Sequence, residues 1–367
     1  ADQHLDSSTV QSVTHWIVHL IPTSMNTLIA GGAGFIGLNL AEAILRSGGH
    51  VVIYDPGTMP DAAQRTFDEL PGTWCHIQES VIDSEALTST LTEQRIEQVF
   101  YGAAVTSGPD RERDTPESVL SVNLLGLATV ARLAAKTDIR RLINLSSGSA
   151  YGLPDEDESD WPPTLREEHT RERPVSLYAL SKFATEITTR RIAALTGLNA
   201  LSVRLSSIFG PWERDTGFRD TLSAPLQASV AAQCGEPVIL ERHESRDWTY
   251  SRDVADALLA LMSHQNPKYD LYNITAGRTW GTIDWCKQLA RYFPDFSYRL
   301  AEGDDTPTID LYSTTDRPPL DPGRLRDDLG YTLPYNIDTM FADFRQWLSA
   351  NPDFWGSVDN RLTGVTR

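Results

Sequence analysis

Near the N-terminus, three glycines recur at three-residue spacing between a short apolar run and an amphipathic stretch. Gly31 allows a tight turn, Gly34 lets the backbone approach a pyrophosphate, and Gly37 lets a helix pack closely on a sheet. A helix that begins here offers free N–H groups and a partial positive charge to phosphate. The pattern therefore predicts a strand, a dinucleotide-binding turn and a helix. The loop residues expected to contact the dinucleotide are Gly31, Gly34, Phe35, Ile36 and Gly37.

A carboxylate follows the next apolar run, Val51–Tyr54. Asp55 stands 18 residues after Gly37, where a carboxylate accepts hydrogen bonds from the adenosine ribose hydroxyls and repels a 2′-phosphate. No Lys or Arg follows closely in the sequence, so the pattern favours NAD over NADP. The alternative is a turn residue at a strand end, before Pro56.

Short apolar runs alternate with amphipathic stretches in the first half of the chain. Strands are expected at Thr27–Ala30, Val51–Tyr54, Gln98–Gly102, Leu142–Leu145 and, after a helix over about Ser176–Leu195, at Ala200–Leu205. This alternation predicts an α/β fold with a doubly wound parallel sheet of the Rossmann type, which binds ligands at the carboxyl ends of its strands. Later loops are longer and rich in Pro, Trp and Arg. We expect an N-terminal extension over residues 1–24, a mainly dinucleotide-binding domain over 25–205, and a mainly substrate-binding lobe over 206–367 with some strands returning to the sheet.

The formal charge of −18 and the pI near 4.8 argue against a nucleic-acid or anionic-membrane partner, because the summed field repels both. A small molecule recognised locally is the expected ligand. The three cysteines, Cys75, Cys234 and Cys286, are too widely spaced for a disulfide framework or a zinc site. Reduced thiols predict a cytoplasmic protein with no metal.

Two segments invite other interpretations. The first 24 residues contain an apolar stretch, but no Lys or Arg precedes Arg46, whereas a secretory signal needs a positive start. Met25 is a possible alternative start, and no later run reaches the roughly 18 apolar residues of a membrane span. The acidic run Asp155–Glu158 is interpreted as a solvated turn rather than a metal site.

A second group of motifs carries acid–base chemistry. The segment Ser146–Gly152 is followed by Tyr178-Ala-Leu-Ser-Lys182. On a helix, this spacing places the tyrosine and the lysine on one face, so the ammonium is expected to lower the pKa of the phenol. A serine hydroxyl at the preceding strand end reaches the same substrate oxygen. Together these residues predict a proton-transfer site beside a hydride acceptor.

Over about Asn26–Leu348, this arrangement resembles the extended short-chain dehydrogenase/reductase superfamily, in the branch of NAD-dependent sugar epimerases and dehydratases. The resemblance implies that Ser147 is the catalytic serine, that Tyr178 is the acid/base, and that Lys182 holds the nicotinamide ribose and tunes Tyr178. It also implies cofactor contacts for Tyr178, Lys182 and Ala103. A homodimer is implied too, built from the helix bearing Tyr178 and the helix over 118–135. Ser80 stands where the family often has an adenine-contacting Asp, which leaves that contact open.

Dehydratases of this family carry an Asp-Glu pair directly after the catalytic Thr, where this chain has Gly148-Ser149. Dehydration is therefore disfavoured. What remains is reversible oxidation of a sugar hydroxyl, either with re-reduction (epimerisation) or with release of ketone and NADH (dehydrogenation). The segments Arg204–Trp212 and Arg246–Tyr250 are similar to those of nucleotide-sugar 4-epimerases, particularly those acting on UDP-uronates. In that group Arg246 would meet the diphosphate, since a guanidinium binds phosphate oxygens bidentately.

The alternative is a dehydrogenase of a free sugar or sugar acid. Ser207 replaces the family's usual Asn, and the loop Glu213–Asp220 is highly charged. Arg219 in this loop could clamp a carboxylate. A binding protein without activity is disfavoured, because such members usually lose the catalytic Tyr or Lys. The expected substrate contacts are Ser149, Ser207, Arg219 and Arg246.

Overall fold

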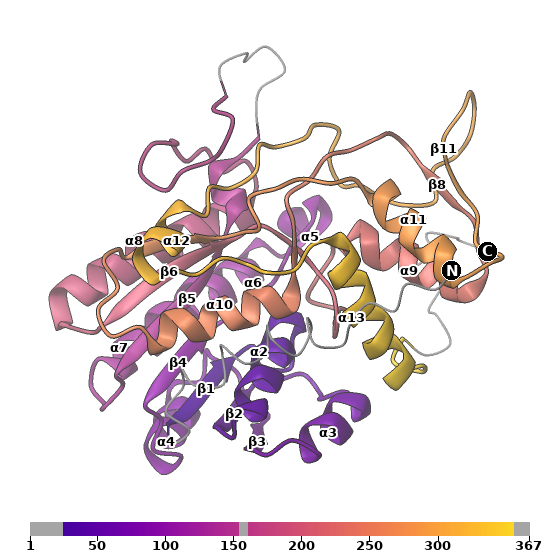
Figure 1. The fold of residues 1–367 in the computed structure, drawn as a ribbon. Helices are drawn as coiled ribbons and strands as arrows, with labels where there is room; N and C mark the ends of the chain where they lie inside the picture. The colour runs from indigo at the N-terminus through magenta and orange to yellow at the C-terminus, as the bar shows by residue number, and fades with distance from the viewer. Residues whose placement is uncertain (1–24, 154–160, 356–367) are drawn as a thin grey trace.

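A computed structural model describes residues 25–153 and 161–355. The predicted extension over residues 1–24 and the acidic run Asp155–Glu158 lie outside the described residues. The central sheet has seven strands in the order β10-β6-β5-β4-β1-β2-β3, all paired in parallel (Figure 1). Its strands are β1 Asn26–Ala30, β2 His50–Tyr54, β3 Thr73–Ile77, β4 Gln98–Tyr101, β5 Arg141–Ser147, β6 Ala200–Leu205 and β10 Leu271–Ile274.

Helices cover both faces of this sheet, because its side chains alternate between two apolar layers. On β1, Ile29 packs into the cluster that contains α2, α3 and α10, whereas Leu28 and Ala30 pack into the cluster with α4 and α7. The helical elements are α2 Phe35–Arg46, α3 Asp61–Asp68, α4 Ser84–Glu93, α5 Pro109–Asp114, α6 Pro116–Leu120, the π-turn η1 Ser121–Gly126, α7 Leu127–Ala134, the 3₁₀ turn η2 Gly148–Tyr151, α8 Leu177–Thr196, α9 Ala224–Cys234, α10 Ser251–Ser263, α11 Thr282–Tyr292, α12 Gly323–Leu329 and α13 Ile337–Ala350.

The predicted doubly wound parallel sheet is confirmed, and each predicted strand matches an observed one to within about two residues at either end. Two strands of the central sheet were not predicted individually. β3 forms a sheet edge and is only partly buried. Its residues need not be apolar, and without an apolar run the strand was not recognised in the sequence. β10 is short and includes the buried Asn273. It pairs with β6 although it comes from the predicted substrate lobe.

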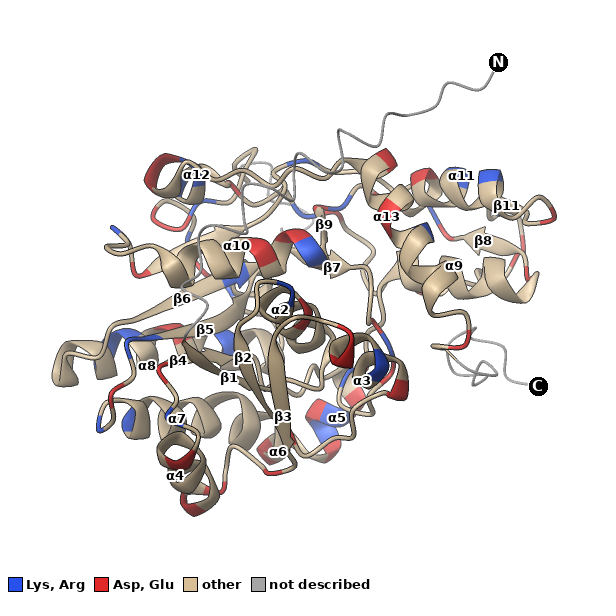
Figure 2. Cartoon of the chain, turned by 60° about the horizontal axis from the view of Figure 1, so that its bottom comes forward, with Lys and Arg blue, Asp and Glu red and all other residues tan. Residues whose placement is uncertain are grey.

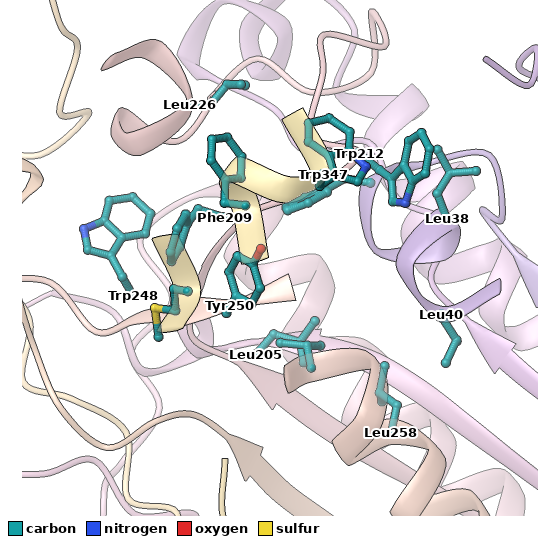
Figure 3. Packing of buried hydrophobic residues seen from close by; sticks show 14 of the residues in the cluster. Leu38, Leu40, Leu205, Phe209, Trp212, Leu226, Trp248, Tyr250, Leu258 and Trp347 are labelled. Atoms are coloured by element: carbon teal, nitrogen blue, oxygen red, sulfur yellow. The ribbon is translucent and has the colours of Figure 1, made fainter. Parts of the chain in front are cut away.

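The remaining strands form two small parallel pairs: β7 Ser207–Phe209 with β9 Trp248–Tyr250, and β8 Val238–Leu240 with β11 Tyr298–Leu300. An aromatic cluster surrounds the first pair (Figure 3). The ring centroids of Phe209 and Tyr250 lie 5.5 Å apart, and those of Trp212 and Trp347 lie 5.3 Å apart. Such packing, with the hydrogen bonds that join Pro211 to Asn39 and Trp212 to Glu42, fixes the chain after β7 between α13 and α2.

One helical stretch among the described residues, Pro116–Ala134, is long and apolar enough to cross a membrane by length and composition. A buried core helix passes the same test, and 44% of the window is buried. The stretch comprises α6, η1 and α7 and includes the π-turn.

Candidate active site

A pocket lies at the carboxyl ends of β1, β4, β5 and β6, where the fold predicts ligand binding. Its lining joins the glycine loop, the serine and tyrosine motifs, and the charged loop after β7. Of the residues expected to contact cofactor or substrate, the pocket is lined by Gly31, Gly34, Phe35, Ile36, Gly37, Ser147, Tyr178, Lys182, Ser207, Arg219 and Arg246. Asp55, Ala103 and Ser149 lie outside this lining.

The glycine loop is too crowded for side chains at two of its positions. Gly31 has φ +79°, and a Cβ there would lie 2.6 Å from the Ala103 nitrogen. A Cβ on Gly37 would lie 2.4 Å from the Gly31 carbonyl oxygen. Gly34 is the N-cap of α2 and provides no side-chain cap, which leaves N–H groups of the first turn available to an anion. The loop therefore fits a dinucleotide pyrophosphate.

Asp55 lies at the end of β2 beside this loop. Its carboxylate accepts hydrogen bonds from Ala33 N at 3.1 Å and Gly57 N at 2.7 Å. Burial raises the pKa of Asp55, and these hydrogen bonds oppose the rise. A cation that was not expected from the sequence lies here: Arg214 is electrostatically close to Asp55 and donates to the Ala33 carbonyl at 3.0 Å.

We expect Asp55→Ala to weaken NAD binding by roughly 10- to 100-fold, the usual value of hydrogen bonds to a charged group. NADP binding should weaken less, since the variant loses a repelling carboxylate and keeps Arg214. Fluorescence titration with both cofactors measures the difference. Asp61→Ala, which changes an exposed carboxylate at the start of α3, is the control. Equal losses for NAD and NADP would refute the assignment.

Ser147 ends β5 and caps the turn η2. Its Oγ accepts hydrogen bonds from Ser149 N at 3.1 Å and Ser149 Oγ at 2.9 Å. Ser149 lies outside the pocket lining and supports Ser147, and its predicted contact with substrate stays a prediction.

Tyr178 and Lys182 project from the first turns of α8, which is capped by the Ser176 hydroxyl. The Tyr178 hydroxyl is hydrogen-bonded to Ser147 and to Thr106. Lys182 Nζ donates to the Leu145 carbonyl at 2.8 Å and lies 5.9 Å from the centroid of the Tyr178 ring. The serine, tyrosine and lysine predicted from separate motifs therefore meet in one place.

The expected lowering of the Tyr178 pKa by Lys182 is not seen. Burial raises the pKa of Tyr178, and hydrogen bonds from Ser147 and Thr106, together with the nearby Arg219, oppose that rise. Burial also lowers the pKa of Lys182 to about 8. The reason is that the Lys182 ammonium is directed at a backbone carbonyl rather than at the phenol oxygen.

Arg219 and Arg246 line the rest of the pocket, and Arg317 lies beside Arg246 outside that lining. Arg219 pairs with the buried Glu213 at 2.8 Å. Arg246 donates to the Leu311 carbonyl at 2.8 Å. Arg317 donates to the Gly148 carbonyl at 2.8 Å, and burial together with Arg246 lowers its pKa to about 10. Two neighbouring, partly buried guanidiniums form an arrangement suited to an anion with more than one charge.

The chain that carries this site matches a known protein family. A family model described as the NAD dependent epimerase/dehydratase family matches residues 27–275, which is more than half of the chain. The chain belongs to the NAD-dependent epimerase/dehydratase family. The predicted family, the enzymatic nature of the protein and NAD as its cofactor are thereby confirmed.

Both branches of this family occur among the relatives. The UDP-glucose 4-epimerase of Mycolicibacterium smegmatis is 28% identical over 64% of this chain and 72% of its own. The dTDP-glucose 4,6-dehydratase of Escherichia coli is 25% identical over 91% of this chain and 96% of its own. A solved UDP-glucose 4-epimerase of Thermotoga maritima, with UDP-glucose, has TM-score 0.72 and 22% identity, and covers 89% of this chain and 100% of its own.

Three site residues of this family member escaped the sequence analysis as contributors: Thr106, Arg214 and Arg317. Thr106 and Arg317 come from loops that no motif marks, and Arg214 lies in the charged loop Glu213–Asp220, where only Arg219 was expected to make a contact. Arg317 is separated from Arg246 by 71 residues, and only its position in Thr-Thr-Asp-Arg-Pro-Pro, a stretch without periodicity, was visible in the sequence. Their contacts are long-range, so no local pattern predicts them.

Proposed function

We propose that the protein is a nucleotide-sugar 4-epimerase. The proposal is carried by one observation: Ser147, Tyr178 and Lys182 share a pocket with Arg246, and Arg317 is its close neighbour. A diphosphate offers the multiple negative charge that this arginine pair suits, and its binding would hold the sugar hydroxyl at Tyr178.

In this proposal, Tyr178 removes the proton of the sugar hydroxyl, and Ser147 donates a hydrogen bond to the same oxygen. Lys182 holds the nicotinamide ribose. NAD, when bound, would supply the hydride acceptor for the carbon that carries this hydroxyl, and return of the hydride to the opposite face would invert that carbon. Among the described residues, no Asp or Glu lines the pocket. This supports epimerisation over dehydration, which needs an acid and a base for water elimination.

A dehydrogenase of a free sugar or sugar acid is the second candidate, favoured by Arg219. Its guanidinium lines the pocket, lies 5.1 Å from the centroid of the Phe35 ring and is electrostatically close to Tyr178. A carboxylate on the substrate would find a partner there.

The two functions are separated by assaying UDP-glucose, UDP-glucuronate and their 4-epimers beside free aldoses and sugar acids. We expect interconversion of a nucleotide sugar, measured by product separation, with no net NADH absorbance. Accumulation of stoichiometric NADH from a free sugar acid would establish the second candidate instead.

A homodimer in the cytoplasm completes the proposal. Exposed apolar residues mark the two helices expected at the interface: Leu125 on η1, and Leu180, Ile187 and Leu195 on α8. Leu180 and Ile187 are seven residues apart and share one face of α8. We propose that these faces pack against their copies as a four-helix bundle. The free thiols of Cys75, Cys234 and Cys286 support a reducing compartment.

Light scattering should therefore give twice the chain mass at micromolar concentration. Replacing Leu180 and Ile187 together by Lys should yield a monomer, because four buried charges would then meet at the interface. Replacing the exposed Tyr292 of α11 and Leu300 of β11 by Lys is the control. A wild-type protein that stays monomeric would refute the dimer.

A further inference from the structure

The loop over residues 215–221 is attached through residues 217–220 to the segment over residues 106–111. Thr106 N donates to the Phe218 carbonyl at 2.8 Å, and Asp220 N donates to the Thr106 carbonyl at 2.9 Å. Arg111 grips Asp220 with two hydrogen bonds, of 2.8 and 2.7 Å, and donates to the Gly217 carbonyl at 2.9 Å. Gly108 N donates to the same carboxylate at 3.0 Å. Phe218 and Arg219 of this loop line the pocket.

The segment over residues 106–112 also holds Tyr178 in two places. The Thr106 side chain is hydrogen-bonded to the phenol hydroxyl. Glu112 Oε1 accepts hydrogen bonds from the backbone nitrogen of Tyr178 at 3.0 Å and from Ser107 Oγ at 3.0 Å. Thus α5 presents one charged residue, Arg111, to the pocket loop and the next, Glu112, to the start of the catalytic helix. Figure 2 shows residues of both signs on this short helix.

The ion pair between Arg111 and Asp220 differs from an ordinary surface ion pair. Exposed ion pairs contribute about 0–1 kcal/mol to stability. The pair of Arg111 and Asp220 is bidentate, and its side chains are only roughly one quarter exposed. Three further hydrogen bonds, each donated by a backbone N–H group, join the same two segments. The hydrogen bond from Arg111 is the main reason that the pKa of Asp220 is lowered. The pair is therefore built to fix the loop against α5.

We propose that the segment over residues 106–112 couples the loop over residues 215–221 to the catalytic tyrosine. Contact between this loop and Arg111 then fixes Tyr178 in its working position. Arg111, Glu112 and Asp220 are then positioning residues. The inference rests on the proposed role of Tyr178 and holds for both candidate reactions, because both begin with the same proton transfer.

A double-mutant cycle of Glu112→Ala and Asp220→Ala tests the coupling. Neither side chain lines the pocket, and α5 contains no buried residue, so these variants should fold. We expect each single variant to lower kcat by about 10-fold, since small misplacements of a reacting group are costly. The double variant should also lose about 10-fold rather than about 100-fold. NAD affinity and the melting temperature should stay near those of the wild type.

A second readout separates positioning from a general structural role. When Tyr178 loses its fixed contact with Thr106, the apparent pKa in the pH profile of kcat should rise in both single variants, because that hydrogen bond lowers the pKa of Tyr178. Arg113→Gln is the matched control, since Arg113 lies on the same helix and pairs with the exposed Asp110. Each of three results would overturn the coupling. They are a loss of kcat in the double variant equal to the product of the two single losses, an unchanged pH profile of kcat, and an equal loss of kcat in Arg113→Gln. Failure of the proposed function itself is seen separately, as full activity in Tyr178→Phe.

Discussion

Replacing Tyr178 by Phe is expected to lower turnover by about 10²- to 10⁴-fold, the usual contribution of general acid–base catalysis. The change removes only the ionisable oxygen, which is hydrogen-bonded to Ser147 and Thr106, and leaves the ring packing in place. NAD affinity should survive. Wild-type activity should rise with pH as the phenol ionises, because burial raises the pKa of Tyr178 and keeps it protonated near neutrality.

The control for this variant is Tyr151→Phe. Tyr151 is fully buried, and its hydroxyl donates to Asn273 at 3.1 Å, but it does not line the pocket. It should lose some stability and little turnover. If Tyr178→Phe keeps full activity in the reaction that the wild type performs, Tyr178 is not the acid/base.

The second large effect is expected from Arg246→Gln. Removing one partner of a buried, hydrogen-bonded charge pair costs about 2–5 kcal/mol, so kcat/KM for a nucleotide sugar should fall by roughly 30- to several thousand-fold. NAD affinity should be unchanged. Arg242→Gln is the control, since Arg242 pairs with Asp316 outside the pocket lining. An unchanged kcat/KM for nucleotide sugars would show that Arg246 does not bind the diphosphate of the substrate.

The parts of the site that the sequence predicted are those governed by local backbone rules. Gly31 and Gly37 are required because a Cβ would meet backbone atoms, and such a requirement is written in the sequence as glycine. The central strands follow from apolar runs. Tyr178 and Lys182 share a helix, so their spacing alone places them on one face.

The rest depends on contacts between distant segments. Arg214 is electrostatically close to Asp55 although it lies 159 residues later in the chain. The residues that directly follow Asp55 therefore could not predict it. Lys182 lies on the predicted face, yet its ammonium donates to the Leu145 carbonyl, so its effect on Tyr178 could not be inferred from spacing. The two contacts of Glu112 arise only because α5 folds over the start of α8.

The most direct test of the central claim uses a nucleotide sugar that carries deuterium on C4, the carbon that is oxidised and reduced again. We expect the 4-epimer to form with the deuterium still on C4 and no NADH to accumulate, because the same hydride leaves and returns within one bound complex. NMR of the product and NADH absorbance measure both quantities. Deuterium appearing in released NADH together with a 4-keto product, or no conversion of any nucleotide sugar, would contradict the account.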